Sequence, residues 1–181
     1  MKGHETASEI VEFWHAAGPD RWFAKDEAFD REFHGRFLDR HFSAARRELD
    51  HWAETAEGAL ALIILLDQFP RNCFRGTGHM FATDPLARHF ARKAITAGHD
   101  KTIAEELRVF LYLPFEHSED IEDQRLSVEL TQSLPKEYMK YAVEHLEIIE
   151  RFGRFPHRNP ALGRETTPEE QTFLDGGGFA G

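Results

Sequence analysis

The spacing of the phenylalanines is the feature that most restricts how this chain can fold. Phe29, Phe33 and Phe37 recur every four residues, and most positions between them are charged. Such spacing is typical of the buried face of an amphipathic helix. Phe42 and Leu49 extend the stripe, so we predict one long helix that turns its phenylalanines inward. No stretch alternates apolar and polar residues over the length of a strand, and we therefore predict an all-α fold.

The segment 57–69 is apolar on nearly all sides, which predicts a central buried helix. Pro70 is expected to end it, because a proline inside a helix removes a main-chain hydrogen bond. Capping residues predict the limits of the other helices. The predicted starts are at Thr6, Asp26, Asp84, Ser118, Lys136 and Thr167, and the predicted ends are at Gly18, Gly98, Pro114 and Gly153.

The length of the chain predicts a single domain over residues 1–181. The chain has a mass of 20.9 kDa, and its 41% of hydrophobic residues are enough for one sizeable core. Three consecutive glycines, Gly176–Gly178, lie close to the end of the sequence. They predict a flexible tail over residues 175–181.

Charge and hydropathy indicate a cytoplasmic protein. The formal net charge of -10 is opposite in sign to what nucleic acids attract, so we predict no nucleic-acid partner. The longest apolar run, 59–66, is far too short to span a bilayer, which predicts no membrane association. The polar first residues lack the apolar core of a secretory signal. The single cysteine, Cys73, cannot form an internal disulfide and suits a reducing compartment.

Two loops combine Phe-Pro with a following arginine and asparagine. The first provides Arg71 and Asn72, and the second provides Arg158 and Asn159. Two guanidinium groups on rigid proline-containing corners can hold a carboxylate or a phosphate through paired hydrogen bonds. An arginine beyond a helix end can also cover main-chain carbonyls, and asparagine is a common turn residue. A purely structural role for these residues is therefore the alternative.

Titratable residues gather at a predicted junction between two helices. Glu116 can orient His117 and raise its basicity for proton transfer. The alternative is capping, with Ser118 as the N-cap and with Glu119 and Asp120 in the first turn, where the helix dipole favours acids. Capping leaves His117 unexplained, so His117 is the better functional candidate.

Asp67 is a carboxylate within the apolar central helix. An isolated charge is costly to bury, so we expect Asp67 to pair with an arginine. Arg71 lies one turn later, and such a pair would anchor a site at the first loop. Cys73 follows closely, and a cysteine outside a disulfide is more often a small buried hydrophobic residue than a reactive thiol.

Five segments carry a resemblance to a known family. They are Trp22–Asp26, Leu66–Asn72, Phe81–Pro85, Leu113–Asp120 and Phe152–Asn159. Together they resemble the bacterial family catalogued as domain of unknown function 924. The resemblance spans almost the whole chain and implies an α-helical, tetratricopeptide-like fold of helical hairpins. It implies no activity. His15 departs from the family pattern, in which a second aromatic residue is expected at that position.

We expect a small anionic ligand to bind in a cleft where the two Phe-Pro loops meet the junction at His117. The expected ligand-binding residues are Asp67, Arg71, Asn72, Glu116, Arg158 and Asn159, and the candidates for proton transfer are His117 and His157. Whether a reaction follows binding is left open, so the chain is either a binding protein or an enzyme.

Two other classes of function fit the sequence. The first is a helical scaffold that presents a groove to a peptide or a protein partner. The second is a metal-assisted hydrolase built on His117, Glu116, Asp120 and His157. The di-iron spacing Glu-x-x-His occurs twice, but the first predicted helix is too short for a di-iron bundle. With no paired cysteines and no glycine-rich phosphate loop, the sequence predicts no metal site and no cofactor.

Overall fold

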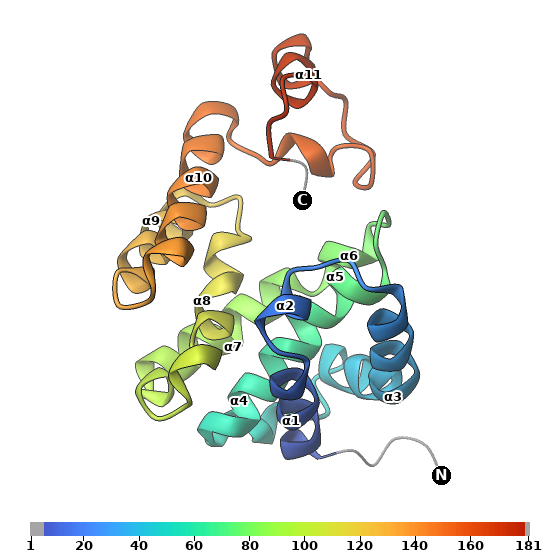
Figure 1. Cartoon of the computed structure of the whole chain (residues 1–181), viewed down its shortest axis with the longest axis vertical. Coiled ribbons are helices and arrows are strands. Elements are labelled where there is room, and N and C mark those ends of the chain that lie inside the picture. Colours follow the sequence, from blue (N-terminus) through green and yellow to red (C-terminus); the bar gives the residue numbers. More distant parts are fainter. Residues whose placement is uncertain (1–5, 180–181) are drawn as a thin grey trace. The chain divides into compact units, whose positions relative to one another are not determined.

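The computed structural model of the chain describes residues 6–179 (Figure 1). In that part of the chain every regular element is a helix, which confirms the predicted all-α fold. The tetratricopeptide-like arrangement of helical hairpins stays a prediction.

The chain divides into two compact units. The first unit comprises Met1–Arg75 and His79–Pro114, and the second comprises Gly76–Gly78 and Phe115–Gly181. Two compact units do not by themselves make two domains, so a single domain over residues 1–181 stays a prediction.

The first unit contains most of the helices. They are α1 (Ala7–Ala17), α2 (Pro19–Trp22), α3 (Glu27–Ala45), α4 (Ala56–Ile63), α5 (Phe69–Cys73), α6 (His79–Ala82), α7 (Asp84–Thr96) and the first part of α8 (Val109–Glu116). A π-helix, Ile64–Gln68, joins α4 to α5, and short 3₁₀-helices cover Asp50–Glu54, His99–Lys101 and Glu105–Leu107.

The phenylalanine stripe lies inward, as its spacing predicts. Phe29, Phe33 and Phe37 are buried on α3, which begins at the predicted N-cap Asp26. The extension of the stripe to Phe42 is wrong, because that ring is 36% exposed. A four-residue step keeps a position on one helix face, so the stripe continues at position 41, where His41 is fully buried. The buried face of α3 therefore ends in an imidazole.

The central helix does not end at Pro70 as predicted. It changes to π-helical hydrogen bonding, in which the N–H of Phe69 donates to the carbonyl of Ile64, and it then continues as α5. Pro70 has no N–H to donate, and a wider turn is one way in which a helix accommodates an irregularity. Pro114 likewise lies inside α8 and does not end it.

One side chain from α3 and one from the residue that directly precedes α7 bond to the carbonyls just before Pro70. Nδ1 of His41 lies 2.8 Å from the carbonyl oxygen of Leu65, and the hydroxyl of Thr83 donates to the carbonyl of Leu66 over 2.5 Å. Both carbonyls belong to fully buried residues. These bonds attach α3 and the start of α7 to the main chain of the central helix, because buried carbonyls need donors.

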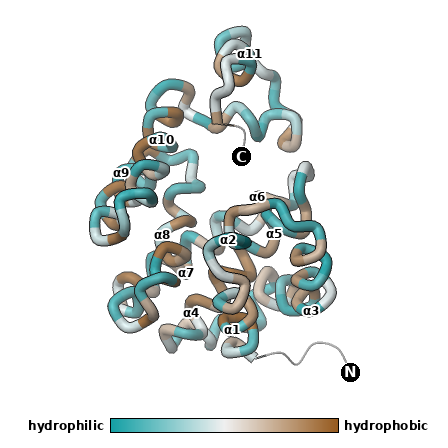
Figure 2. The backbone as a smooth tube through the Cα atoms, viewed as in Figure 1, coloured by the Kyte–Doolittle hydropathy of each residue, from teal (hydrophilic) through white to brown (hydrophobic). Residues whose placement is uncertain are grey.

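The second unit contains α9 (Ile121–Thr131), α10 (Lys136–Phe152), α11 (Pro168–Asp175) and a 3₁₀-helix, Pro156–Arg158. Its core is formed by Ile148, Ile149 and Phe155. Figure 2 shows hydrophobic and hydrophilic residues alternating along α10, as an amphipathic helix requires. α10 ends at Gly153, and α11 begins with a capping box at Thr167, both as predicted.

The start of α9 differs from the prediction. Asp120, not Ser118, is the N-cap, because its carboxylate accepts the N–H of Glu122. The hydroxyl of Ser118 donates to Asp123 over 2.7 Å and accepts the N–H of Asp120. Glu119 lies before the helix and bonds elsewhere, so only one of the two acids assigned to the first turn caps α9.

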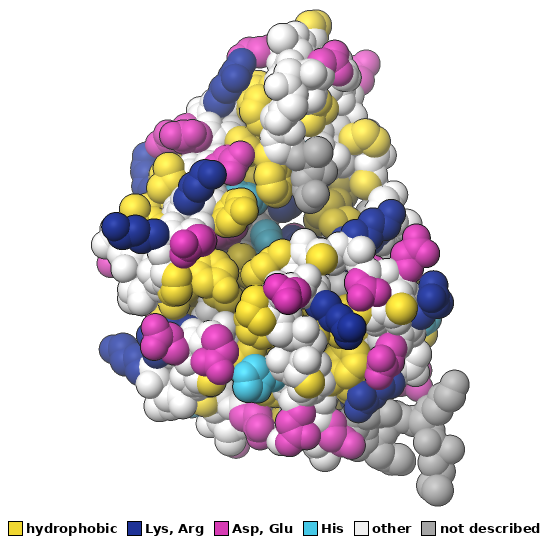
Figure 3. Space-filling view, viewed as in Figure 1, with side chains coloured by type: hydrophobic (Ala, Val, Ile, Leu, Met, Phe, Trp, Pro, Cys, Tyr) yellow, Lys and Arg dark blue, Asp and Glu magenta, His cyan; other side chains and the backbone are white. Residues whose placement is uncertain are grey.

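None of the helices between residues 6 and 179 is both long and apolar enough to span a bilayer. On the face shown in Figure 3, acidic and basic side chains are interspersed over the surface.

Thr83→Val tests the bond that Thr83 makes to the central helix. We expect the free energy of unfolding to fall by about 1–3 kcal/mol, because the buried carbonyl of Leu66 loses a donor. Thr96→Val is the matched control, since the hydroxyl of Thr96 donates to the carbonyl of Arg92 on an exposed surface. The control should change stability by less than about 0.5 kcal/mol. Equal effects in urea denaturation would show that the Thr83 bond has no special role.

Candidate functional site

The Phe-Pro-Arg-Asn segment of the first unit lies on α5 and not on the predicted loop, and a buried ion-pair network holds it. Nη1 of Arg71 lies 3.2 Å from Asp67 Oδ1 and 2.7 Å from Asp84 Oδ1, and Nη2 lies 3.0 Å from Asp84 Oδ2. Nη1 also donates to the main-chain carbonyl of Asp67. This confirms that Asp67 pairs with an arginine. Burial alone would lower the pKa of Arg71, but the carboxylates of Asp67 and Asp84 raise it above its ordinary value.

Two carboxylates surround one guanidinium in this network. The net charge of the three groups is therefore negative, and Asp67 itself is fully buried. An arginine surrounded in this way stabilises the fold, and it attracts an anion less than an arginine without acidic neighbours. Contact between Arg71 and a ligand stays a prediction that these bonds do not favour.

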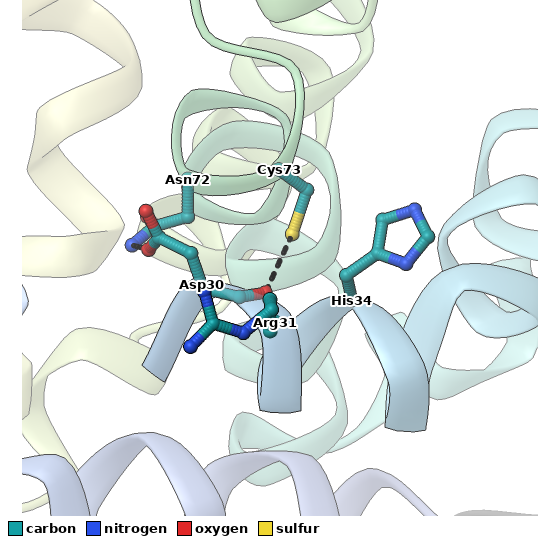
Figure 4. A pocket seen from close by; sticks show the side chains of 5 residues that line it. All are labelled: Asp30, Arg31, His34, Asn72 and Cys73. Atoms are coloured by element: carbon teal, nitrogen blue, oxygen red, sulfur yellow. Dashed lines mark hydrogen bonds between the residues drawn. The ribbon is translucent and has the colours of Figure 1, made fainter. Parts of the chain in front are cut away.

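A hollow of 260 Å³ lies where α3 meets α5 (Figure 4). Its lining consists of Asp30, Arg31, His34, Asn72 and Cys73. The amide of Asn72 donates to Asp30 Oδ1 over 2.7 Å, and the thiol of Cys73 lies 3.8 Å from the Asp30 carbonyl. Asn72 is thus bonded to Asp30, and its predicted contact with a ligand stays a prediction.

Cys73 is not activated as a nucleophile. Burial, followed by the negative charge of Asp30, raises the pKa of its thiol to about 12. At neutral pH the sulfur therefore keeps its proton, and only the thiolate is a strong nucleophile. The expectation that Cys73 behaves as a small, partly buried residue agrees with this environment.

A histidine pair lies beside the central helix. Nδ1 of His41 carries the proton, because its partner, the carbonyl of Leu65, can only accept. His41 Nε2 lies 2.9 Å from His79 Nε2, so His79 donates when both rings are neutral. The rings of Phe69 and Phe74 pack against His41 at centroid distances of 4.9 and 5.8 Å. Burial, helped by the nearby His79, lowers the pKa of His41 to about 4.

In the second unit, Glu119 and Arg164 fix the main chain at Phe155. The two side chains form a paired ion bridge of 2.8 and 2.9 Å. Glu119 Oε1 also accepts the N–H of Phe155 over 2.8 Å, and Arg164 donates to the carbonyl of Phe155 over 3.1 Å. Partial burial would raise the pKa of Glu119, but the bonds from Arg164 and Phe155 lower it. The main-chain N–H and carbonyl of Phe155 are both hydrogen-bonded, just before the 3₁₀-helix that begins at Pro156.

Asn159 lies at the centre of a second polar network. Its amide donates to Glu170 Oε2 over 3.2 Å, and its carbonyl accepts from Arg164 Nε over 3.0 Å. Glu170 also accepts two bonds from Arg154 and one from the N–H of Thr167. These bonds, led by that of Arg154, lower the pKa of Glu170 to about 2. Asn159 is fully buried and holds the loop to α11, and a ligand contact by Asn159 stays a prediction.

The remaining site residues of the second unit gather around the ring of Phe155. Nδ1 of His145 lies 3.6 Å from Glu116 Oε1 and 2.8 Å from the carbonyl of Tyr141. The guanidinium carbon of Arg158 lies 4.4 Å from the centre of the Phe155 ring, and the rings of His145 and His157 lie at 5.4 and 5.8 Å. We refer to these residues as the Phe155 cluster, which comprises Glu116, His145, Phe155, His157 and Arg158.

The Phe155 cluster contains three of the expected site residues. Glu116 and Arg158 are buried, at 6% exposure each, whereas His157 is half-buried. Arg71 belongs to the first unit and Arg158 to the second, so a cleft shared by the two loops stays a prediction. His117 is half-buried between α8 and α9, and its part in proton transfer also stays a prediction.

Sequence reasoning does not single out His145. It lies on an amphipathic helix without any motif around it, so its position resembles that of any packed histidine. The same holds for His41, which continues a phenylalanine stripe. A histidine one step beyond a regular apolar stripe is the signal that identifies His41, whereas no local signal identifies His145.

The described residues give no support to a metal centre. Between residues 6 and 179, no three His, Cys, Asp or Glu side chains are placed to hold one ion. His15, the end of the first Glu-x-x-His segment, has its Nε2 3.2 Å from Glu106 instead. The metal-assisted hydrolase therefore stays a prediction without a structural argument in its favour.

Arg71→Gln tests whether Arg71 is structural. We expect the free energy of unfolding to fall by about 3–5 kcal/mol, because Asp67 and Asp84 remain buried without their cation. Arg125→Gln is the control, since Arg125 makes a 2.6 Å pair with Glu122 on the exposed surface. The control should cost less than about 1 kcal/mol. A similar cost for both variants in chemical denaturation would contradict the structural role.

His41 should make stability depend on pH. Its pKa is about 4 in the folded chain and near 6.5 when unfolded, so the unfolded chain binds more protons between these values. Stability is therefore lost as pH falls from 6.5 to 4, by about 2–3 kcal/mol. We expect His41→Gln to remove this part of the decline and exposed His89→Gln to retain it, in denaturation curves at pH 4 to 8. Parallel curves for the two variants would rule out His41 as the cause.

Comparisons with known proteins place the chain in a family. The model of a family described as bacterial protein of unknown function (DUF924) matches residues 10–178. A solved structure, of the protein of unknown function ATU0120 from Agrobacterium tumefaciens, is 63% identical to this chain with a TM-score of 0.92. The match covers 94% of this chain and 97% of that chain. No curated protein matches. The chain belongs to the bacterial DUF924 family, as its five sequence segments indicate.

Proposed function

We propose that the protein binds a small anionic ligand at the Phe155 cluster. The observation that carries the proposal is the gathering of one guanidinium and two imidazoles around a single aromatic ring. Few structural roles require three groups that can carry positive charge at one point of a small core. A negatively charged ligand can form hydrogen bonds or ion pairs with all three groups.

Arg158 is the central residue of the proposed site. Its charge is permanent, and its planar guanidinium can form two parallel hydrogen bonds with a carboxylate or a phosphate. Because the side chain is largely buried, its attraction for an anion is weakened less by solvent than that of a surface arginine. The guanidinium carbon lies 4.4 Å from the centre of the Phe155 ring, within the range of a cation–π contact.

His157 is half-buried and gives the proposed site its access to solvent. Its ring packs against Phe155 beside Arg158 and can donate a hydrogen bond to an anion. His157 therefore keeps the role of candidate for proton transfer that its sequence position predicts.

Glu116 and His145 form the inner side of the proposed site. The carbonyl of Tyr141 fixes the proton of His145 on Nδ1, which leaves Nε2 as the basic nitrogen of the neutral ring. Glu116 Oε1 lies 3.6 Å from Nδ1 of the same ring. Binding of an anion at this site needs no chemical step.

Residues of the first unit are not used in this proposal. Arg71 is neutralised by two carboxylates, and Asn72 donates to Asp30. The scaffold alternative, in which a groove binds a peptide or a protein, stays a prediction.

Arg158→Gln tests the proposal directly. We expect the affinity for inorganic phosphate and benzoate to fall at least tenfold in isothermal titration, because the ligand loses a paired, charged contact. Arg151→Gln is a matched control, since the guanidinium carbon of Arg151 lies 4.6 Å from the ring of Phe152 at an exposed position of the same unit. The control should bind as the unchanged protein does. The proposal fails if neither anion binds the unchanged protein, or if both variants bind equally well.

A further inference from the structure

The end of α11 delivers one aromatic ring to the Phe155 cluster. The N–H of Gly178 donates to the carbonyl of Phe173 over 2.9 Å, and the N–H of Gly177 donates to Leu174 over 3.1 Å. This is the Schellman pattern of helix ends, and Gly177 has the left-handed φ of +80° that it requires. The turn reverses the chain immediately before Phe179.

The glycines are needed for this turn. A Cβ at Gly178 would lie 2.5 Å from the ring of Phe173, so no other residue fits without a shift. A left-handed backbone at Gly177 disfavours other residues as well. Gly177 and Gly178 thus allow the turn that places Phe179.

The ring of Phe179 packs against both imidazoles of the cluster. It lies 4.5 Å from the ring of His145 at an interplanar angle of 61°, and 5.2 Å from the ring of His157 at 79°. Both contacts are edge-to-face, which is a favourable arrangement for aromatic rings. Phe179 is only partly buried.

We propose that Phe179 occupies an aromatic subsite, and that a planar ring of the ligand takes its place. The subsite is the space edge-on to the rings of His145 and His157. With the acidic group of the ligand at Arg158, the ligand class is an aromatic acid, a step that rests on the proposed function. The tail segment Gly176–Phe179 then acts as a strap that closes the subsite in the absence of ligand.

The position of Phe179 suits reversible displacement. Its segment follows the last helix and is held to α11 through main-chain bonds of a single turn. A segment held by the bonds of a single turn opens at a lower free-energy cost than a helix in a core. A tethered ring also competes strongly with a ligand, because its effective concentration at the subsite is in the millimolar range for a short tether.

The alternative is that Phe179 only completes the core. It packs against the group formed by Ile148, Ile149 and Phe155, and such packing needs only an apolar side chain of suitable size. The two explanations differ in what the space accepts. A subsite for planar rings prefers an aromatic probe to an aliphatic one, whereas a core position does not distinguish them.

The test uses the full chain with Phe179→Ala and two uncharged probes. N-acetyl-phenylalanine amide supplies a planar ring, and N-acetyl-leucine amide supplies an aliphatic group of similar size. The readout is the NMR resonance of the ring Hε1 of His145 and of His157, assigned by substitution. We expect the aromatic probe to shift both resonances in the variant at concentrations at least tenfold lower than in the unchanged protein. The aliphatic probe should shift neither.

The inference is overturned if the folded variant responds to neither probe, responds equally to both, or responds as the unchanged protein does. Phe179→Leu serves if the alanine variant does not fold, because leucine keeps an apolar side chain against the core. The leucine variant should bind the aromatic probe more tightly than the unchanged protein, and equal binding would also overturn the inference.

Adding Arg158→Gln to Phe179→Ala separates this inference from the proposed function. We expect the double variant to keep its response to the uncharged aromatic probe and to lose at least tenfold in affinity for benzoate. If the uncharged probe binds Phe179→Ala but no anion binds any form, the subsite stands and the anionic ligand is refuted. If benzoate binds through Arg158 but the uncharged ring does not bind, the subsite is refuted and the proposed function stands.

Discussion

The first unit depends on donors for the buried carbonyls that precede Pro70. A proline within a buried helix leaves the main chain short of an N–H, and an unpaired carbonyl in a core costs as much as a lost hydrogen bond. His41 on α3 and Thr83, which directly precedes α7, provide these donors. These bonds also attach α3 and the start of α7 to defined positions along the central helix. Both carbonyls lie in the π-helical segment Ile64–Gln68.

The two Phe-Pro segments accommodate their prolines in different ways. In the first, the helix continues through Pro70, and Arg71 is held by two carboxylates. In the second, α10 ends before the proline. The main-chain N–H of Phe155 donates to Glu119, and its carbonyl accepts a bond from Arg164, the partner of Glu119. Arg71, Asn72 and Asn159 bond to acidic side chains within the fold. The guanidinium carbon of Arg158 lies 4.4 Å from the centre of the Phe155 ring, and the charge of Arg158 helps to lower the pKa of Glu119.

Local signals predicted the helices well. The phenylalanines of α3, the capping boxes of α1 and α11, and Gly153 after α10 all act within a few residues, so the sequence alone reveals them. The errors at Pro70 and Ser118 have another cause. Whether a proline ends a helix depends on donors supplied from distant positions, here His41 and Thr83, and spacing does not reveal them. His145 and Phe179 join the candidate site only through the same kind of distant contact.

The net negative charge of the chain affects how an anion would be recognised at the proposed Phe155 site. A net charge of -10 repels anions at a distance, so long-range attraction does not guide such a ligand to this protein. Recognition must come from short contacts, where a largely buried guanidinium acts at close range and salt screens it little. An aromatic ring on the ligand adds a contact that is independent of charge. The pairing of Arg158 with an aromatic subsite therefore suits an anionic ligand that binds an acidic protein by contact and not by attraction from afar.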